Sequence, residues 1–274
     1  MESKPLIDIP KKGRLILGID EHGRARRKLA TTVTLISPEK KLLGLIPEAT
    51  SAKLEEWVKK NMTYNQRIRV NEISMDMPKS LRKQIKILFP KSRFVIDHFH
   101  VIAYLNNLIR DEYQFMIKYG NLKKEDKEKL PRRAAKGFGI IRLLYQGGKY
   151  WKKNEKEKIK IVFKLMPRIA ELWYAKEEAR AIYRESIDKN EARKRWGYVL
   201  SLMPPVAKRT LKTRLEEILN YFDNRTTNGF TEGIHTKVKL LKRISFGLKN
   251  PQVYVEKLEF GFVKPNRLIH NHTC

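Results

Sequence analysis

The chain has 274 residues, and its 59 Lys and Arg outnumber its 30 Asp and Glu, which gives a formal net charge of +29 at neutral pH. With 4 Trp, 11 Tyr and 11 Phe, it is too rich in aromatic residues to be disordered throughout. It has no uncharged apolar run near the roughly 18 residues of a membrane span, and no secretory leader pattern. The single cysteine, Cys274, excludes a disulfide framework and a Cys-based zinc finger. We therefore expect a cytoplasmic protein that is not embedded in a membrane.

The large positive charge predicts a polyanionic partner. Packing many like charges into one fold costs self-repulsion, and a polyanion relieves it while its own counterions are released. Nucleic acid is the favoured partner on this ground. An anionic membrane surface and the Lys enrichment of heat-adapted proteins stay open as alternatives. The charge carries no information about catalysis.

The first hundred residues have strand and helix patterns in alternation, which indicates an α/β fold. Apolar or β-branched runs predict strands at 14–20, 29–36, 41–46, 70–75 and 93–97. A helix is expected after Ser51, which would be its N-cap, and another from Pro78 through Leu88.

Helical periodicity replaces the strand patterns from Val101 to about Asn220. Its clearest breaks are Gly147-Gly148 and Pro204-Pro205. One more amphipathic helix is expected at 230–244. The chain therefore divides into an α/β part at 1–100, a helical part at 101–222 and a C-terminal part at 223–274.

Three acids are placed where they could meet in space. Asp20 and Asp76 each come where an apolar run stops, and Glu232 opens the last amphipathic helix. Ligands of open α/β sheets gather beyond the carboxyl ends of the strands. Three converging carboxylates need a cation, and hard oxygen ligands suit Mg²⁺ or Mn²⁺, which support phosphodiester chemistry. The alternative, that each Asp is an ordinary turn or N-cap residue, stays open at this point.

The helix that carries Glu232 has two different faces. At about 100° per residue, one face holds an acid followed by cations, and the opposite face is apolar. The first face carries Glu232, Thr236, Lys239 and Arg243, and the second carries Ile234, Val238 and Leu241. This arrangement suits a metal at one end and phosphates along the rest, although an ordinary solvated face is the alternative. Asp97 and His100 form a second cluster, which suits either a metal or a hydrogen-bonded corner.

Four segments together resemble a known family. The chain is similar to the catalytic domain of DDE transposases, specifically of the ISL-three family of insertion sequences, over about Leu15 to Phe260. The resemblance continues through 237–243 and Phe246-Gly247, and its main segments are Leu17–Glu21, Ser74–Met77, Val95–Val101 and Thr227–Gly233. It implies a ribonuclease H-like mixed sheet interrupted by a large all-helical insertion. Residues 1–100 would be the first part of the core, 101–222 the insertion, and 223–274 the catalytic helix and tail.

The resemblance also implies roles for individual residues. Asp20, Asp76 and Glu232 would be the catalytic acids and the ligands of Mg²⁺ or Mn²⁺, and Asp97 and His100 would support them. The basic residues of the late helix would contact the DNA backbone: Lys237, Lys239, Lys242 and Arg243. The expected partners are transposon ends and target DNA, bound by a homo-oligomer associated with the prokaryotic nucleoid.

The function that follows is metal-dependent cleavage at transposon ends by water, and then attack of the freed 3′-hydroxyl on target DNA. Members of the family resemble two-part proteins with an N-terminal zinc-binding segment and a helix-turn-helix. This chain starts about fifteen residues before its first strand, so we expect a truncated or unusually short member. Two alternatives stay open: a non-transposing DNA-binding remnant, and a stand-alone metal-dependent nuclease on the same fold.

Overall fold

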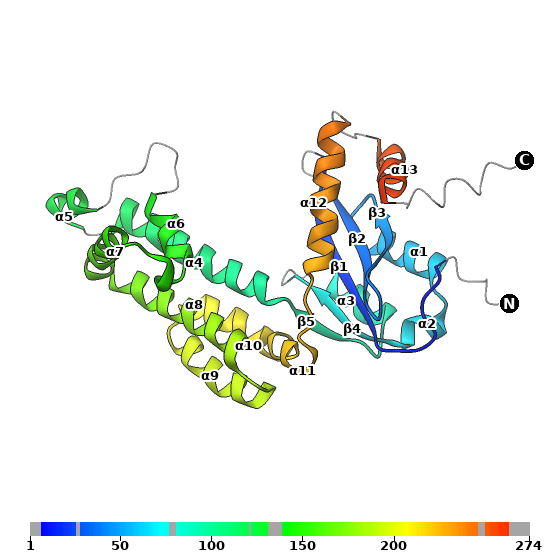
Figure 1. Ribbon diagram of the computed structural model, residues 1–274, viewed down its shortest axis with the longest axis horizontal. Helices are drawn as coiled ribbons and strands as arrows, with labels where there is room; N and C mark the ends of the chain where they lie inside the picture. The colour runs from blue at the N-terminus through cyan, green and yellow to red at the C-terminus, as the bar shows by residue number, and fades with distance from the viewer. Residues whose placement is uncertain are drawn as a thin grey trace, which may run out of the picture. The chain divides into compact units, whose positions relative to one another are not determined.

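The computed structural model describes residues 7–25, 28–76, 81–120, 122–130, 139–245 and 250–262. The chain forms two compact units (Figure 1). The first, here called the sheet unit, combines Met1–Asp97 with Thr226–Cys274, and the second, the helical unit, is His98–Arg225. Separate domains with boundaries at residues 100 and 222 stay a prediction. Within the described residues, no helix is both long and apolar enough to cross a membrane.

The sheet unit is built on a mixed sheet of five strands in the order β3-β2-β1-β4-β5. β2 runs antiparallel to both β1 and β3, whereas β4 is parallel to β1 and to β5. The strands are β1 (Leu15–Ala25), β2 (Lys28–Ser37), β3 (Lys41–Ile46), β4 (Val70–Met75) and β5 (Arg93–Ile96). The helices of this unit are α1 (Ser51–Asn61), α2 (Tyr64–Ile68), α3 (Arg82–Leu88), α12 (Gly229–Ile244) and α13 (Pro251–Phe262). The predicted mixed α/β character is confirmed.

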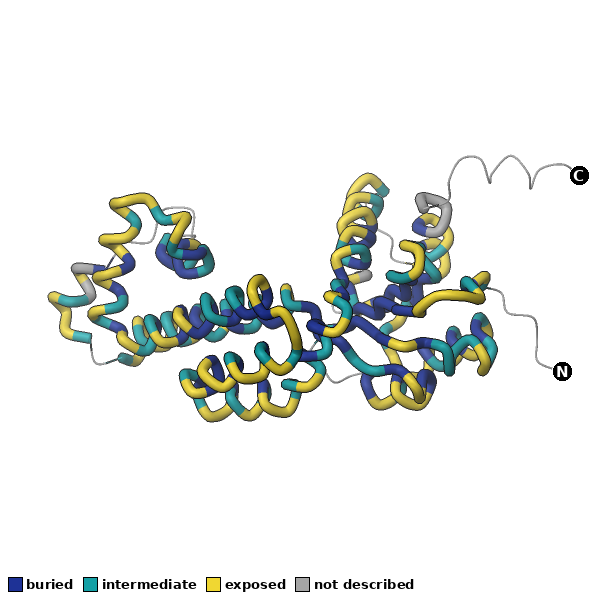
Figure 2. Tube along the Cα trace, turned by 60° about the horizontal axis from the view of Figure 1, so that its bottom comes forward, coloured by how far each residue is buried: buried dark blue, intermediate teal, exposed yellow. Residues whose placement is uncertain are grey.

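Helices cover both faces of the sheet. Successive side chains of a strand point to opposite faces, and both faces carry buried apolar residues. One core cluster joins the sheet to α1 and α3, and it includes Leu17, Ile19, Val33, Ile73, Leu54, Val58, Ile85 and Leu88. A second, smaller cluster joins β2 and β3 to α12 and α13 through Ala30, Leu45, Ile234, Val238, Tyr254 and Leu258. The strands are buried accordingly (Figure 2). The apolar face predicted for the late helix is therefore confirmed as its packing face.

The helical unit follows the helical periodicity expected from the sequence. Its elements are α4 (His98–Tyr119), α5 (Lys124–Lys129), α6 (Gly139–Tyr145), the 3₁₀ turn η1 (Gly148–Tyr150), α7 (Lys153–Leu165), α8 (Pro167–Glu185), α9 (Lys189–Ser201), α10 (Pro205–Leu219) and α11 (Tyr221–Asn224). The predicted breaks are confirmed, because residues 147–148 separate α6 from α7 and Pro204 separates α9 from α10. α8 buries the stripe that contains Ile169, Leu172 and Trp173.

A lysine is buried inside the helical unit. The Lys176 ammonium has no exposed side-chain area, and it donates to the carbonyls of Leu144, at 2.5 Å, and Gln146, at 3.2 Å. Its Nζ also lies 3.1 Å from a carboxylate oxygen of Glu177. Burial lowers the pKa of Lys176 to about 7, because a charged amine is costly in a medium of low dielectric. The lysine thereby supplies hydrogen bonds to the carbonyls that end α6.

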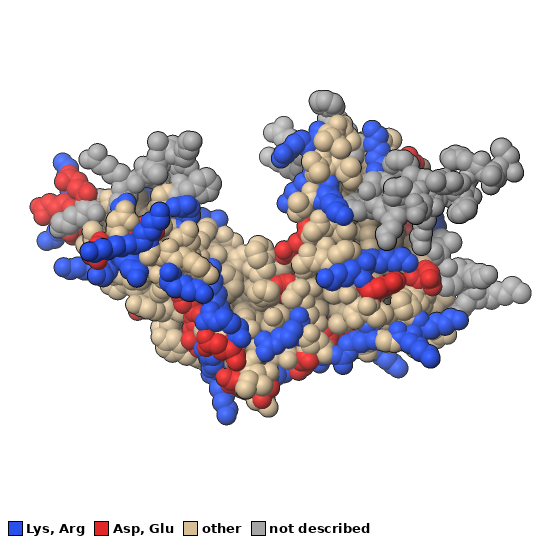
Figure 3. Space-filling model, viewed as in Figure 1, with Lys and Arg blue, Asp and Glu red and all other residues tan. Residues whose placement is uncertain are grey.

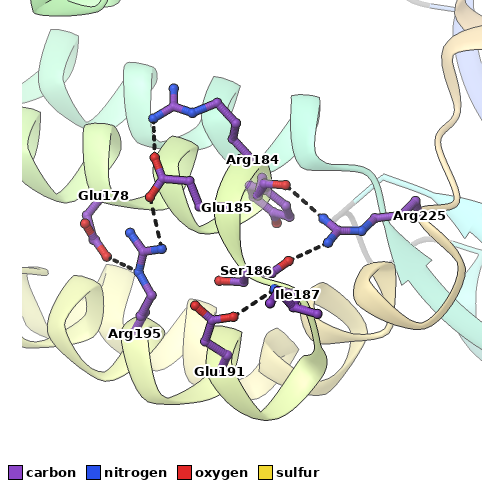
Figure 4. Close-up of polar contacts among 9 residues, drawn as sticks. Glu178, Arg184, Glu185, Ser186, Ile187, Glu191, Arg195 and Arg225 are labelled. Atoms are coloured by element: carbon purple, nitrogen blue, oxygen red, sulfur yellow. Dashed lines mark hydrogen bonds and ion pairs between the residues drawn. The ribbon is translucent and has the colours of Figure 1, made fainter.

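Arg225, the last residue of the helical unit, is hydrogen-bonded to backbone carbonyls at the end of α8 (Figure 4). Arg225 adopts a left-handed conformation with φ of 52°, which is uncommon outside glycine. Its guanidinium donates to the Tyr183 carbonyl at 2.9 Å and also to the Ser186 carbonyl. It lies 5.0 Å from the centre of the Phe222 ring. These contacts fix the connection between α8 and α9. The two helices are also joined by an ion pair, in which Arg195 of α9 lies 2.7 Å from Glu178 of α8.

Several local expectations need correction. β1 continues to Ala25, so Asp20 lies within the strand rather than at its end, because β2 pairs with β1 through its whole second half. The N-cap of α1 is Thr50, whose hydroxyl accepts from the Lys53 amide, so Ser51 is already helical. The short α2 and the C-terminal α13 were not among the predicted elements. Pro78 and Phe246-Gly247 lie outside the described residues.

The first turn of α12 packs closely on β1 at Gly18. A methyl group on Gly18 would lie 2.3 Å from the Thr231 hydroxyl, 2.5 Å from the Thr34 hydroxyl and 2.7 Å from the Asn228 side-chain oxygen. The two threonine hydroxyls are themselves hydrogen-bonded, at 2.7 Å. A glycine at this position therefore allows the helix to approach the strand.

We predict that Gly18→Ala lowers the free energy of unfolding by about 1–3 kcal/mol, because the added methyl group overpacks a closed contact. The matched control is Gly23→Ala in the same strand, where an added methyl group meets nothing within 4 Å. Chemical denaturation of both variants measures the difference. Equal stabilities of the two variants would show that α12 does not depend on this contact.

Candidate active site

The three predicted acids lie on or beside neighbouring elements of the sheet unit. Asp20 is in β1, Asp76 directly follows β4, and Glu232 is in the first turn of α12. The last pair between β1 and β4 joins Gly18 and Ser74, so Asp20 and Asp76 each lie two residues beyond that pair. Because Gly18 faces α12 and side chains alternate along a strand, Asp20 faces α12 as well.

Asp20 is buried, with 7% of its surface exposed. One of its carboxylate oxygens accepts from the Glu21 amide at 2.8 Å, and the other lies 3.4 Å from Nδ1 of His235. Among the described residues, no group of three or more His, Cys, Asp or Glu side chains is gathered closely enough to hold a metal ion. Convergence of Asp20, Asp76 and Glu232 on a shared metal therefore stays a prediction. Their donor chemistry, three carboxylates, is the kind that Mg²⁺ or Mn²⁺ binds.

Asp97 anchors the start of α12. It follows β5, only 2% of its surface is exposed, and its carboxylate accepts from the backbone amide of Asn228, which is the N-cap of α12. A buried carboxylate at a helix N-terminus satisfies an amide that has no partner within the helix and is favoured by the helix dipole. This contact gives Asp97 a structural means to support the site. His100 lies in the first turn of α4, in the helical unit, with its ring edge-on to Phe99.

Another buried acid, which was not predicted from the sequence, holds the segment that leads into α12. Glu72 in β4 has no exposed side-chain area, and its carboxylate accepts from the Thr226 hydroxyl at 2.6 Å. The other oxygen pairs with the Arg93 guanidinium of β5 at 2.5 Å. A buried carboxylate needs such partners, because desolvation of an unpaired charge is very costly. The available signal was a charged residue inside the apolar run of 70–75.

A chain of buried polar side chains leads from Asp20 to the C-terminal helix. Nε2 of His235 lies 3.0 Å from the Thr32 hydroxyl, which lies 3.1 Å from Nδ1 of His22. Nε2 of His22 is hydrogen-bonded to the Tyr254 hydroxyl in α13. The chain therefore links β1, β2, α12 and α13 behind Asp20. None of these four partners was singled out from the sequence.

The direction of each hydrogen bond in this row of side chains follows from which groups can donate and which can accept. Chiefly because it is buried, the pKa of His22 is lowered to about 3, so the ring of His22 is neutral near pH 7. An ionised Asp20 only accepts, so Nδ1 of His235 carries the hydrogen that faces it. With His235 neutral, each donor then points toward Asp20: Tyr254 to His22, His22 to Thr32, and Thr32 to His235. The carboxylate is the terminal acceptor of the chain.

Lys and Arg side chains gather over α12 (Figure 3). Lys237, Lys239 and Arg243 are exposed. Lys242 differs from them, because its ammonium donates to the Gly23 carbonyl of β1 at 2.6 Å. Lys242 therefore fastens α12 to the strand in addition to carrying charge. The basic face and the apolar packing face of α12 are opposite, as its spacing predicts.

We predict that Tyr254→Phe lowers the free energy of unfolding by about 1–3 kcal/mol, because it leaves the buried Nε2 of His22 without its donor. Denaturation by urea measures the change. Tyr64→Phe is the control, because Tyr64 is 53% exposed and lies in the same unit, so its loss should stay within about 0.5 kcal/mol. If Tyr254→Phe were as stable as the control, the hydrogen bond between Tyr254 and His22 would not stabilise the fold.

Comparison with known proteins gives the identity of the chain's family. A family model described as transposase, that of the ISL-three insertion sequences, matches residues 17–258. The searches of the curated proteins and of the solved structures gave no match. The matched range includes the three predicted acids, Asp97 and the basic face of α12. The chain therefore belongs to the transposase family of the ISL-three insertion sequences.

Proposed function

We propose that the chain is the catalytic part of a DDE transposase, which cleaves DNA at transposon ends and joins the freed ends to target DNA. Membership of the transposase family carries this proposal, because it makes DNA the substrate in general terms. The formal charge of +29 supports the same partner. Action in the cytoplasm on nucleoid DNA, by a homo-oligomer bound to transposon ends and target, is part of the proposal.

The fold of the sheet unit supports a ribonuclease H-like assignment. A mixed sheet carries one acid on its first strand and a second directly after its fourth strand, and a late helix carries the third. This is the order that the family resemblance implies for the catalytic acids. The long helical unit, 98–225, comes between the fifth strand and that helix, which suits an insertion.

Asp20, Asp76 and Glu232 would hold the metal. When bound, Mg²⁺ or Mn²⁺ would lower the pKa of the attacking water and neutralise charge on the attacking and leaving oxygens. Asp97 would keep α12 in place through the Asn228 amide, and so keep Glu232 next to the sheet. His235 and the residues behind it would hold the carboxylate of Asp20 in a fixed direction. Each of these residues binds or orients, and none needs to leave its element.

Two bond exchanges make up the proposed reaction. In the first, water attacks the phosphorus at the transposon end, the bond to the 3′-oxygen breaks, and a 3′-hydroxyl is released. In the second, that hydroxyl attacks a phosphorus of the target strand, and the target's own 3′-oxygen leaves. The number of phosphodiester bonds is unchanged in the second exchange, so it needs no nucleotide cofactor.

We predict that Asp20→Asn, Asp76→Asn and Glu232→Gln each abolish Mg²⁺-dependent nicking of supercoiled DNA, because each removes a negative ligand. DNA affinity should be unchanged or slightly raised, since a negative charge near the phosphates is lost. The matched control is Glu56→Gln, an exposed acid of α1. Plasmid nicking and filter binding measure both effects.

The same assays separate the alternatives. Retained nicking in the Asp20 and Asp76 variants would refute the metal mechanism for this chain. Metal-independent DNA binding without any nicking by the unaltered protein would favour the DNA-binding remnant. Nicking without joining of a pre-cut end to target DNA would favour the stand-alone nuclease.

We predict that Lys239→Ala and Arg243→Ala each lower the magnitude of the slope of log K against log salt concentration by about 0.9 on duplex DNA. Both side chains are exposed on the face opposite to the buried Val238. Because each contacts only the backbone, binding should weaken about equally for all sequences. DNA affinity at three salt concentrations measures the slope. An unchanged slope in both variants would remove α12 from the DNA path.

A further inference from the structure

The helical unit contains a cavity of about 880 Å³. It lies among the end of α6, η1, α8 and α9, and its size is within the range of binding sites for small molecules. Four tyrosines line it, Tyr145, Tyr150, Tyr174 and Tyr198. Tyr150, Tyr174 and Tyr198 are 68%, 53% and 55% exposed, respectively. These three aromatic rings are therefore accessible to a ligand and are not buried in the hydrophobic core.

Charged groups of both signs lie among these rings. Lys149, Arg180 and Arg184 line the cavity together with Glu177 and Glu178. Arg180 is held in place, because its guanidinium donates to a Glu177 oxygen at 2.6 Å and to the Tyr145 carbonyl at 2.7 Å. Lys149 lies with its ammonium 5.0 Å from the centre of the Tyr150 ring. The lining thus combines flat rings, cations and carboxylate acceptors.

We propose that this cavity binds an unpaired base of the DNA substrate together with its phosphate. A base has a π-face that stacks on tyrosine, and a flanking phosphate suits Lys149 and Arg184. Glu177 and Glu178 are paired with Arg180 and Arg195, and their remaining lone pairs suit the amino and imino hydrogens of a base. A site for the DNA backbone alone would have no use for these two carboxylates. A paired base has its face covered by its neighbours in the stack, so the site discriminates against intact duplex.

Other classes of ligand match the lining less well. An acidic peptide supplies carboxylates for the cations, but it offers no aromatic face for the three exposed tyrosines. An apolar molecule would shield the charged groups of the lining from water and offer them no hydrogen bonds in exchange. The inference rests on the proposed function only in taking DNA as the substrate, and it requires no metal.

The test compares two labelled duplexes that each contain one 2-aminopurine base. The base is paired in one duplex and unpaired in the other. Binding to the full chain is measured by anisotropy in EDTA, so that no cleavage occurs. We expect the duplex with the unpaired base to bind about 5-fold or more tightly than the paired duplex, with its 2-aminopurine fluorescence quenched by stacking. Tyr150→Ala and Tyr174→Ala should abolish both the preference and the quenching, and Tyr174→Phe should keep both.

The control is Tyr64→Ala, which alters a tyrosine 53% exposed, as Tyr174 is, but in the sheet unit. It should leave the preference unchanged. Equal affinity of the unaltered protein for the two duplexes, a preference that survives in both alanine variants, or displacement of the unpaired-base duplex by a poly-glutamate peptide at equal charge would each overturn the proposal. Loss of the preference in the tyrosine variants supports it even where plasmid nicking is absent, so failure of the catalytic proposal is read separately.

Discussion

The contact between the first turn of α12 and the sheet is the feature on which the candidate active site depends. Glu232 comes more than 200 residues after Asp20 in the sequence, so nothing local places its helix on the sheet. Three separate interactions hold the start of α12 on the sheet: Asp97 accepts the Asn228 amide, Gly18 leaves room for Thr231, and Glu72 accepts the Thr226 hydroxyl. All three act on residues 226–231, which run from just after the helical unit into the first turn of α12. The point where the chain returns from the helical unit to the sheet unit is therefore fixed to the sheet by buried hydrogen bonds.

Behind Asp20, buried polar groups satisfy one another instead of facing apolar surroundings. The pKa of His22 is lowered to about 3, so its ring is uncharged near pH 7 and has one donor and one acceptor for its two neighbours, Thr32 and Tyr254. A network of this kind is stabilising only when each member has its partner. It makes α13 part of the support of the site, because Tyr254 also fills the apolar cluster shared by α12 and the sheet. The C-terminal helix is thus connected to the first acid both by packing and by hydrogen bonds.

Much of the sheet unit could be predicted from local patterns, and the rest required contacts that no local pattern contains. The strands at 41–46 and 70–75 have the predicted bounds, because alternation and turn residues are local signals. The two faces of α12 followed from helical spacing, since only its apolar side finds the sheet. The end of β1 was misjudged because its second half is stabilised by β2, not by its own apolar residues. His22, Thr32, His235 and Tyr254 went unnoticed because each is ordinary in its own segment, and their chain exists only after folding.

Binding of Mn²⁺, followed by its paramagnetic resonance signal, tests most directly whether α12 completes a metal site on the sheet. The full chain without DNA would be titrated beside Asp20→Asn, Glu232→Gln and the exposed control Glu56→Gln. We expect Asp20→Asn and Glu232→Gln each to weaken Mn²⁺ binding by about 10-fold or more, which corresponds to about 1.4 kcal/mol. Glu56→Gln should bind Mn²⁺ as the unaltered protein does. Unchanged binding in Glu232→Gln, with binding lost in Asp20→Asn, would contradict it, because the metal would then belong to the sheet alone.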